Sequence, residues 1–139
     1  MKERAIPESA ILSACLKWLW ANGVFCWRNN TGAYRPEGSG RFIRFGKKGS
    51  ADIIGVNPHG RFVAVETKRK GKKLETHQEQ FKQMIQEKFG VFVLAHSIDD
   101  LEANRDIILS ACKIPNGYAD GVPPKITAKA KKDRQEVEA

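Results

Sequence analysis

Three residues in the middle of the chain, Asp52, Glu66 and Lys68, are of the types that can together hydrolyse a phosphodiester bond. Thirteen positions separate Asp52 from Glu66, and Thr67 lies between Glu66 and Lys68. Two carboxylates can hold a divalent ion against a phosphate group, and a lysine beside them can help to position the attacking water. This chemistry requires that the fold bring the three side chains together.

The surrounding sequence predicts an antiparallel hairpin that does so. Strands are predicted over Asp52–Val56 and Arg61–Lys68, because both segments are rich in apolar residues and a turn sequence separates them. The loop Pro58-His59-Gly60 fits a three-residue turn in which the glycine takes the left-handed conformation. With this loop Asp52 lies opposite Glu66, at a Cβ separation of roughly 4.5 to 5.5 Å, and Lys68 projects to the same side.

An ordinary interpretation of these residues is a surface acid near a cross-strand ion pair between Glu66 and Lys68. Against it, Ile53-Ile54 and Val63-Ala64-Val65 are apolar runs typical of strands that are covered on both faces. Ionised carboxylates in such strands are costly unless a cation offsets them, and clusters of this kind collect at functional sites. The pattern therefore favours a metal site.

Composition indicates one soluble globular domain with an anionic partner. The 139 residues are 41% hydrophobic and 29% charged, and 24 Lys and Arg against 16 Asp and Glu give a net charge of +8. This charge fits nucleic acid or an anionic surface, although a merely soluble basic protein would also carry it. Basic residues flank the acids on both sides, at Arg41, Arg44, Lys47 and Lys48 before them and at Arg69, Lys70, Lys72 and Lys73 after them.

Cysteine usage and hydropathy place the chain in the cytoplasm. Three cysteines without close spacing indicate neither a disulfide framework nor a zinc site, which fits a reducing compartment. No signal-peptide pattern follows Met1, and no apolar stretch is long enough to span a membrane. We expect a soluble protein of the cell interior.

A first helix is predicted from Pro7 to about Ala21, with Gly23 as its left-handed stop. Glu8 aligns with the apolar face of this helix and is expected to point inward, either as a third acid of the site or as a first-turn acid favoured by the helix dipole. Trp18 and Trp20 leave little of the helix polar. We therefore expect a homodimer that buries part of this helix.

The remaining elements follow from local signals. A strand over Val24–Arg28 leads to a long, polar, mobile loop over residues 29–40. Arg35 and Tyr34 of the loop, with Trp27 and Arg28 just before it, could meet phosphates and unstacked bases, or the loop could be a solvated connection with one packed aromatic. A helix from Thr76, its cap, to about Lys88 stops at Gly90 and precedes a strand over Val91–Ala95, parallel to the Glu66 strand. A last helix runs from Ser97 to Cys112, and residues 113–139 are expected to form a disordered tail.

This order of elements resembles the α/β restriction-endonuclease-like fold of the PD-(D/E)XK superfamily, an αβββαβ core with a mixed sheet flanked by helices. The VRR-NUC family is the most similar, over about residues 6–112. The resemblance rests on these segments: Pro7-Glu8-Ser9, Trp27-Arg28-Asn29-Asn30-Thr31-Gly32, Gly49-Ser50-Ala51-Asp52-Ile53-Ile54-Gly55, Gly60-Arg61-Phe62, Glu66-Thr67-Lys68-Arg69, and Leu74 with Gln78. Ala51 departs from the proline that the family usually has before the acid.

The resemblance implies a role for each matching residue. Asp52 and Glu66 resemble the ligands of Mg²⁺ or Mn²⁺, aided by the carbonyl of Thr67, and Glu8 resembles an additional acid. Lys68 resembles the lysine that orients water. Gln78 resembles a family glutamine near the active site, although an exposed helical amide is the ordinary interpretation and Gln80 is a weaker match.

The resemblance also implies a homodimeric, virus-encoded or bacterial endonuclease that cuts branched DNA, Holliday junctions in particular. Two active sites in a dimer would make two cuts on a two-fold-symmetric junction. Two alternatives stay open. One is a nuclease for other DNA or RNA substrates, and the other is a non-catalytic DNA-binding module of the same fold.

Overall fold

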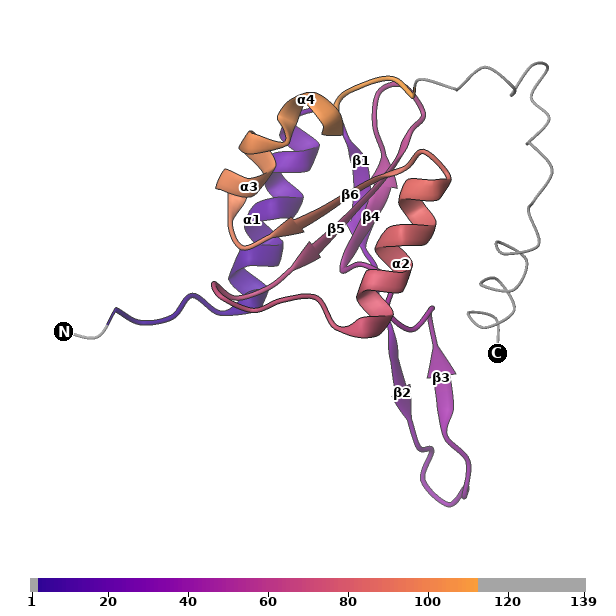
Figure 1. Ribbon diagram of the computed structural model, residues 1–139. Helices are drawn as coiled ribbons and strands as arrows, with labels where there is room; N and C mark the ends of the chain where they lie inside the picture. The colour runs from indigo at the N-terminus through magenta and orange to yellow at the C-terminus, as the bar shows by residue number, and fades with distance from the viewer. Residues whose placement is uncertain (1–2, 113–139) are drawn as a thin grey trace, which may run out of the picture.

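The structure, a computed structural model, describes residues 3–112, so the expected tail over residues 113–139 lies outside the described residues. Along this part of the chain, one helix is followed by five strands, a second helix, a sixth strand and two short helices (Figure 1). Their bounds are α1 Glu8–Ala21, β1 Phe25–Arg28, β2 Gly32–Tyr34, β3 Ile43–Phe45, β4 Ile53–Val56, β5 Phe62–Thr67, α2 Thr76–Glu87, β6 Val91–Ala95, α3 Ile98–Ala103 and α4 Arg105–Ile108.

Four of the strands form a mixed sheet in the order β1-β4-β5-β6. The pairs β1/β4 and β4/β5 are antiparallel, while β5 and β6 are parallel and are joined through α2. A parallel pair needs such a crossover connection, which the sequence predicted from its strand, helix and strand order. The predicted α/β architecture, a mixed sheet flanked by helices, is confirmed.

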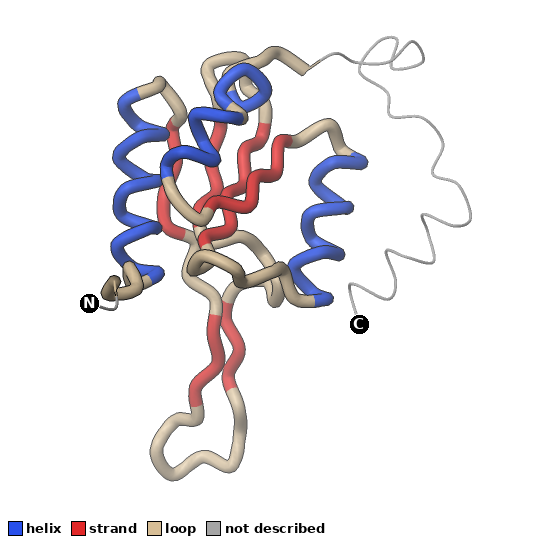
Figure 2. The backbone as a smooth tube through the Cα atoms, turned by 60° about the vertical axis from the view of Figure 1, so that its left-hand side comes forward, coloured by secondary structure: helices blue, strands red, loops and turns tan. Residues whose placement is uncertain are grey.

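Helices cover the two faces of the sheet unequally. Helices α1, α3 and α4 lie on one face and α2 lies on the other (Figures 1 and 2). Val63 and Val65 of β5 belong to the core cluster that α1 completes with Cys15 and Leu19, all of them buried. Strand side chains alternate, so Glu66 projects to the opposite face, the one that carries α2.

The first helix begins and ends where the sequence predicted, whereas the second differs in detail. Pro7 precedes α1, and Gly23 has a φ of 82° just after it. Glu75, rather than the predicted Thr76, is the cap of α2, because the side chain of Gln78 accepts a hydrogen bond from the Glu75 amide at 2.9 Å. The left-handed residue that ends α2 is Phe89, with a φ of 65°, not Gly90.

The predicted continuous last helix is wrong, since the structure divides it at Asn104 into α3 and α4. The Asn104 side chain donates to the Asp100 carbonyl at 2.7 Å, and such a local bond competes with a continuing helix. The predicted start is confirmed, because Ser97 Oγ accepts from the Asp99 amide at 3.2 Å.

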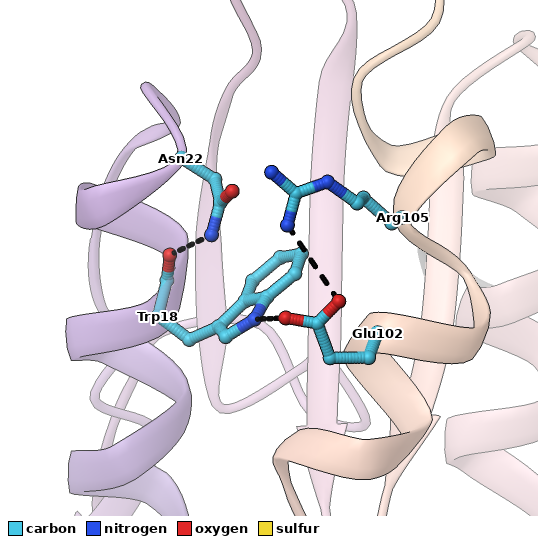
Figure 3. Close-up of polar contacts among 4 residues, drawn as sticks. All are labelled: Trp18, Asn22, Glu102 and Arg105. Atoms are coloured by element: carbon cyan, nitrogen blue, oxygen red, sulfur yellow. Dashed lines mark hydrogen bonds and ion pairs between the residues drawn. The ribbon is translucent and has the colours of Figure 1, made fainter.

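Trp18 joins the first and third helices (Figure 3). Its indole Nε1 donates to Glu102 Oε1 at 2.7 Å, and Arg105 binds the other oxygen of that carboxylate at 3.6 Å. Trp18 is therefore buried by its own chain and leaves no surface for a partner. Trp20 differs, with 55% of its surface exposed.

The expectation of an irregular loop after β1 is wrong. Strands β2 and β3 pair with each other as a separate two-stranded sheet that projects from the core (Figures 1 and 2). We call residues 31–46 the arm. Its strands have three residues each, too few for a periodic signal, and the pairing joins segments that a polar turn separates.

Candidate active site

The hairpin of β4 and β5 has the register that the sequence predicted. Ile53 pairs with Val65, so Asp52 stands opposite Glu66 at the end of the strands. The turn follows the expected chemistry, because Asn57 and Arg61 close it with a 2.9 Å backbone hydrogen bond and Gly60 has a φ of 78°.

Each of the two acids is held by the strand that carries the other. Asp52 Oδ2 accepts hydrogen bonds from both the amide and the hydroxyl of Thr67, each at 2.9 Å. In return, the Asp52 amide donates to Glu66 Oε2 at 3.2 Å. These bonds fix the carboxylates side by side, and the hydroxyl of Thr67 is a contact that sequence reasoning missed, since it assigned only the carbonyl.

Burial makes the charge on Glu66 unfavourable. Only 4% of this residue is exposed, and desolvation together with the nearby charge of Asp52 raises the pKa of Glu66 to about 8. The charge of Lys68 and the Asp52 amide oppose that rise, and Glu8 adds to it weakly. Two carboxylates in one desolvated place repel each other, so a cation would stabilise both in ionised form.

Gln78 connects α2 to the acids. Its Nε2 donates to Glu66 Oε1 at 2.8 Å, while its Oε1 accepts from the Glu75 amide at 2.9 Å. The second bond fixes the orientation of the amide, so the donor end faces the carboxylate. Gln80, the weaker match, is exposed on the same helix.

Lys68 lies at the end of β5, where the chain is fixed by β6. Its amide donates to the Ala95 carbonyl at 3.0 Å, and its own carbonyl lies 3.2 Å from His96 Nδ1. The same ring nitrogen lies 3.0 Å from the Arg69 carbonyl, so it must carry a proton to bond either oxygen. His96 was not singled out in the sequence, because no local pattern relates it to Lys68.

Glu8 is exposed, so the expectation that it points inward is wrong. It is the first residue of α1, and at that end of the helix an acid can face solvent even when its alignment follows the apolar stripe. Its charge nevertheless reaches Glu66, as the raised pKa of that carboxyl reflects.

Hydrogen bonds from Asn29 and a close contact with α2 fix the loop before Asp52, and no local sequence motif predicts them. Asn29 Nδ2 donates to Ser50 Oγ at 2.7 Å and to the Ala51 carbonyl at 3.0 Å, and the Asn29 amide donates to the Asp52 carbonyl at 2.7 Å. Gly49, with a φ of 81°, lies so close to α2 that a Cβ there would be 2.5 Å from the His77 carbonyl oxygen. This contact places the loop next to the helix turn that carries Gln78.

The donor set fits a hard divalent ion. Within residues 3–112 no group of three or more His, Cys, Asp or Glu side chains is arranged to hold a metal. Asp52, Glu66 and the Thr67 carbonyl offer only oxygen ligands, and Mg²⁺ is commonly bound by one or two carboxylates with water and substrate phosphates completing its shell.

All ten basic residues that we expect to contact nucleic acid are exposed. The ion pair of Arg105 with Glu102 involves none of these ten residues. Four of them, Arg69, Lys70, Lys72 and Lys73, lie on the segment between β5 and α2. Five lie on or directly after the arm: Arg35, Arg41, Arg44, Lys47 and Lys48. The last, Arg28, ends β1.

Comparison with protein families identifies the VRR-NUC domain over residues 6–98, which is more than half of the chain. The chain belongs to the VRR-NUC domain family. The matched range contains Glu8, Asp52, Glu66, Lys68 and Gln78, so the VRR-NUC match covers the whole candidate site. This family is one of nucleases, which implies DNA as the partner.

No curated protein matches the VRR-NUC chain. Within the described part of the chain, every helix is too short or too polar to cross a membrane.

Proposed function

We propose that this VRR-NUC protein is a divalent-metal-dependent endonuclease that hydrolyses phosphodiester bonds in branched DNA, Holliday junctions in particular. The observation that carries the proposal is the convergence of Asp52, Glu66 and Gln78, with Lys68 close enough to lower the pKa of Glu66. Such an oxygen-rich, desolvated group beside a lysine suits phosphodiester hydrolysis.

The carboxylates of Asp52 and Glu66, with the Thr67 carbonyl, would hold Mg²⁺ or Mn²⁺. When bound, the ion supplies a Lewis acid for the phosphate and lowers the pKa of a coordinated water. Thr67 keeps Asp52 in place through two hydrogen bonds, and Gln78 does the same for Glu66. Groups that orient metal ligands commonly change metal affinity or activity by roughly 10- to 100-fold when removed.

The ammonium group of Lys68 is proposed to orient the attacking water and to offset negative charge on the transferring phosphate. Its position after Glu66 is fixed by the backbone bonds to Ala95 and His96. Removal of the ammonium group would therefore affect the reaction more than the fold.

A homodimer is part of this proposal, and an exposed aromatic cluster supports it. Trp20, Phe25 and Trp27 are 55%, 60% and 47% exposed, and each neighbouring pair of rings has centroids 5.6 Å apart. Contiguous exposed apolar side chains of this size are typical of interfaces. A two-fold dimer would present two sites to the two-fold-symmetric branched substrate.

The decisive experiment compares cleavage of a labelled four-way junction and its matched linear duplex in Mg²⁺, Mn²⁺ or chelator. We expect metal-dependent cutting that favours the junction. Asp52→Asn keeps an oxygen for Thr67 but removes the charge, so it should lower the cleavage rate by at least about 100-fold. Circular dichroism would verify that the variant is folded.

Asp106→Asn is the matched control, because Asp106 is an exposed acid of α4 and has no part in the site. It should cut at the rate of the unchanged chain. Cutting that persists in chelator or in Asp52→Asn would contradict the metal mechanism, and equal cutting of both DNAs would contradict the branched substrate.

A further inference from the structure

The arm depends little on the core for its structure. Strands β2 and β3 pair only with each other, and all six of their residues are exposed. Both figures of the whole chain show the arm standing away from the helices and the main sheet (Figures 1 and 2). A two-stranded hairpin is marginally stable alone, so exposed apolar residues on it call for a partner.

One face of the arm is apolar. Tyr34 pairs with Ile43, and Gly32 pairs with Phe45, so the three large side chains project to the same side. They are 53%, 42% and 46% exposed in the order Tyr34, Ile43 and Phe45. The Phe45 ring lies over Gly32, where a Cβ would be only 2.7 Å from its Cζ atom, and the Tyr34 and Phe45 ring centroids are 6.4 Å apart.

The other face of the arm is cationic. Ala33 pairs with Arg44 on this side, and the guanidinium of Arg35 lies 4.4 Å from the ring centroid of Phe42. Arg41 lies in the connection between the two strands, Glu37 is the single acid of the arm, and two lysines follow at its base. In the part of the chain that the structure describes, none of these three arginines forms an ion pair.

The base of the arm is fixed to the candidate active site. Asn29, just before the arm, donates its amide to the Asp52 carbonyl, so the arm leaves the sheet where the first acid lies. At its other end Gly46, with a φ of 72°, approaches the Asn30 carbonyl so closely that a Cβ there would be 2.8 Å away. The base of the arm therefore lies next to Asp52, while the rest of the arm extends away from the main sheet (Figures 1 and 2).

We propose that the arm recognises the branch itself: its apolar face stacks on bases exposed at the discontinuity of a duplex, and its arginine face binds the flanking phosphates. This rests on the proposed function. Aromatic side chains stack on unpaired bases without sequence preference, and apolar side chains can enter an opened base step. Excess positive charge favours this polyanion over a second copy of a chain whose net charge is +8.

The test measures affinities of the full chain for an immobile four-way junction and its matched duplex in Ca²⁺, with light scattering on the same samples. Tyr34→Leu keeps an apolar side chain but removes the ring, and it should weaken junction binding by about tenfold while leaving duplex binding within about twofold. Tyr34→Phe, which keeps the ring, should bind as the unchanged chain does. The control Ile107→Ala removes an exposed apolar side chain on α4 and should also change nothing.

Two further readouts separate stacking from charge. A 2-aminopurine at the branch should be quenched by the unchanged chain and by Tyr34→Phe but not by Tyr34→Leu. Arg44→Gln, on the opposite face, should weaken junction and duplex binding alike and reduce the salt slope by about 1.

Several results would overturn the proposal. The first is equal binding of junction and duplex by the unchanged chain. The second is a Tyr34→Leu variant that keeps both the junction preference and the quenching. The third is a set of arm variants that change only the mass in light scattering, which would make the arm a surface for self-association. Selective, arm-dependent binding without cleavage in Mg²⁺ or Mn²⁺ would uphold the arm proposal and contradict the nuclease proposal.

Discussion

At the scale of single residues, the burial of Glu66 is unfavourable for its ionised form but serves the candidate site. The same burial that raises its pKa excludes water from the place where two carboxylates meet. Sequence reasoning could place Glu66 opposite Asp52, because both positions follow from a local turn and a period of two. It could not find the bonds from Thr67 Oγ1 or Gln78, since side-chain rotamers and the approach of α2 depend on packing across the whole domain.

The raised pKa of Glu66 gives a prediction for metal binding. In the absence of metal, Glu66 lowers the free energy of unfolding most at high pH. The reason is that its carboxyl ionises near about pH 4.3 in the unfolded chain but near pH 8 in the folded chain. Metal needs the ionised carboxylate, so protons compete with it below pH 8. Excess Mg²⁺ should therefore raise the Tm by about 3 °C or more at pH 8 and by less at pH 6.

Differential scanning calorimetry at the two pH values would check this prediction. Glu66→Gln should lose most of the Mg²⁺ effect at both, whereas the exposed Glu79→Gln on α2 should retain it. A Mg²⁺ effect of equal size at pH 6 and pH 8 would show that the ion binds away from Glu66.

At the scale of elements, Asn57 determines the geometry of the hairpin. Its Oδ1 accepts from the amides of His59 and Arg61 at 2.9 and 3.0 Å, and its Nδ2 donates to the carbonyls of Ile108 and Ser110 at 2.9 and 2.8 Å. The turn that sets the register of the two acids is thus joined to the last helix.

We expect Asn57→Ala to destabilise the chain by about 2 to 4 kcal/mol, because it leaves buried backbone groups at both ends without partners. Urea denaturation would measure the loss, with an unchanged slope if unfolding stays two-state. His59→Ala, at an exposed position of the same turn, should change the free energy of unfolding by less than about 0.5 kcal/mol. Similar losses for both variants would argue against this role of Asn57.

Some of the helices and strands can be predicted from the sequence, and others cannot. Helix α1 and strands β4, β5 and β6 carry strong local signals, and each was predicted within one or two residues of its observed bounds. The arm was missed because the pairing of Gly32 with Phe45 depends on contacts between segments, not on a pattern within either. The break at Asn104 depends on one side-chain bond that many asparagines could form.

At the scale of the whole molecule, one sheet face is exposed at its β1 end, where Trp27 is 47% exposed. Trp27 pairs with Ile54, which pairs with Ala64, and Ala64 pairs with Phe92, so these residues form a row on one face. Helix α2 covers the far end of the row, where the Phe81 and Phe92 ring centroids are 6.2 Å apart. The end at β1 is left exposed, and β1 is also an edge strand, the usual place for pairing with another chain.

If this exposed β1 end is the dimer interface, Trp27→Lys should separate the protomers. Multi-angle light scattering should give twice the chain mass of 15.6 kDa for the unchanged protein and the single mass for the variant. Ile107→Lys, on the exposed side of α4, should remain dimeric. A single mass for the unchanged protein at micromolar concentration would rule out the dimer itself.

The way the arm joins the sheet has a consequence for how substrate preference can diverge. Arg28 and Ile53 are direct cross-strand partners, so the chain leaves the sheet and returns to it at neighbouring points. Mutation, insertion or deletion within the arm, residues 31–46, should leave the pairing of β1, β4 and β5 intact, because the strands of the arm pair only with each other. Descendants of one ancestor could thus exchange this segment for another and acquire new DNA targets, while inheriting the same pair of acids unchanged.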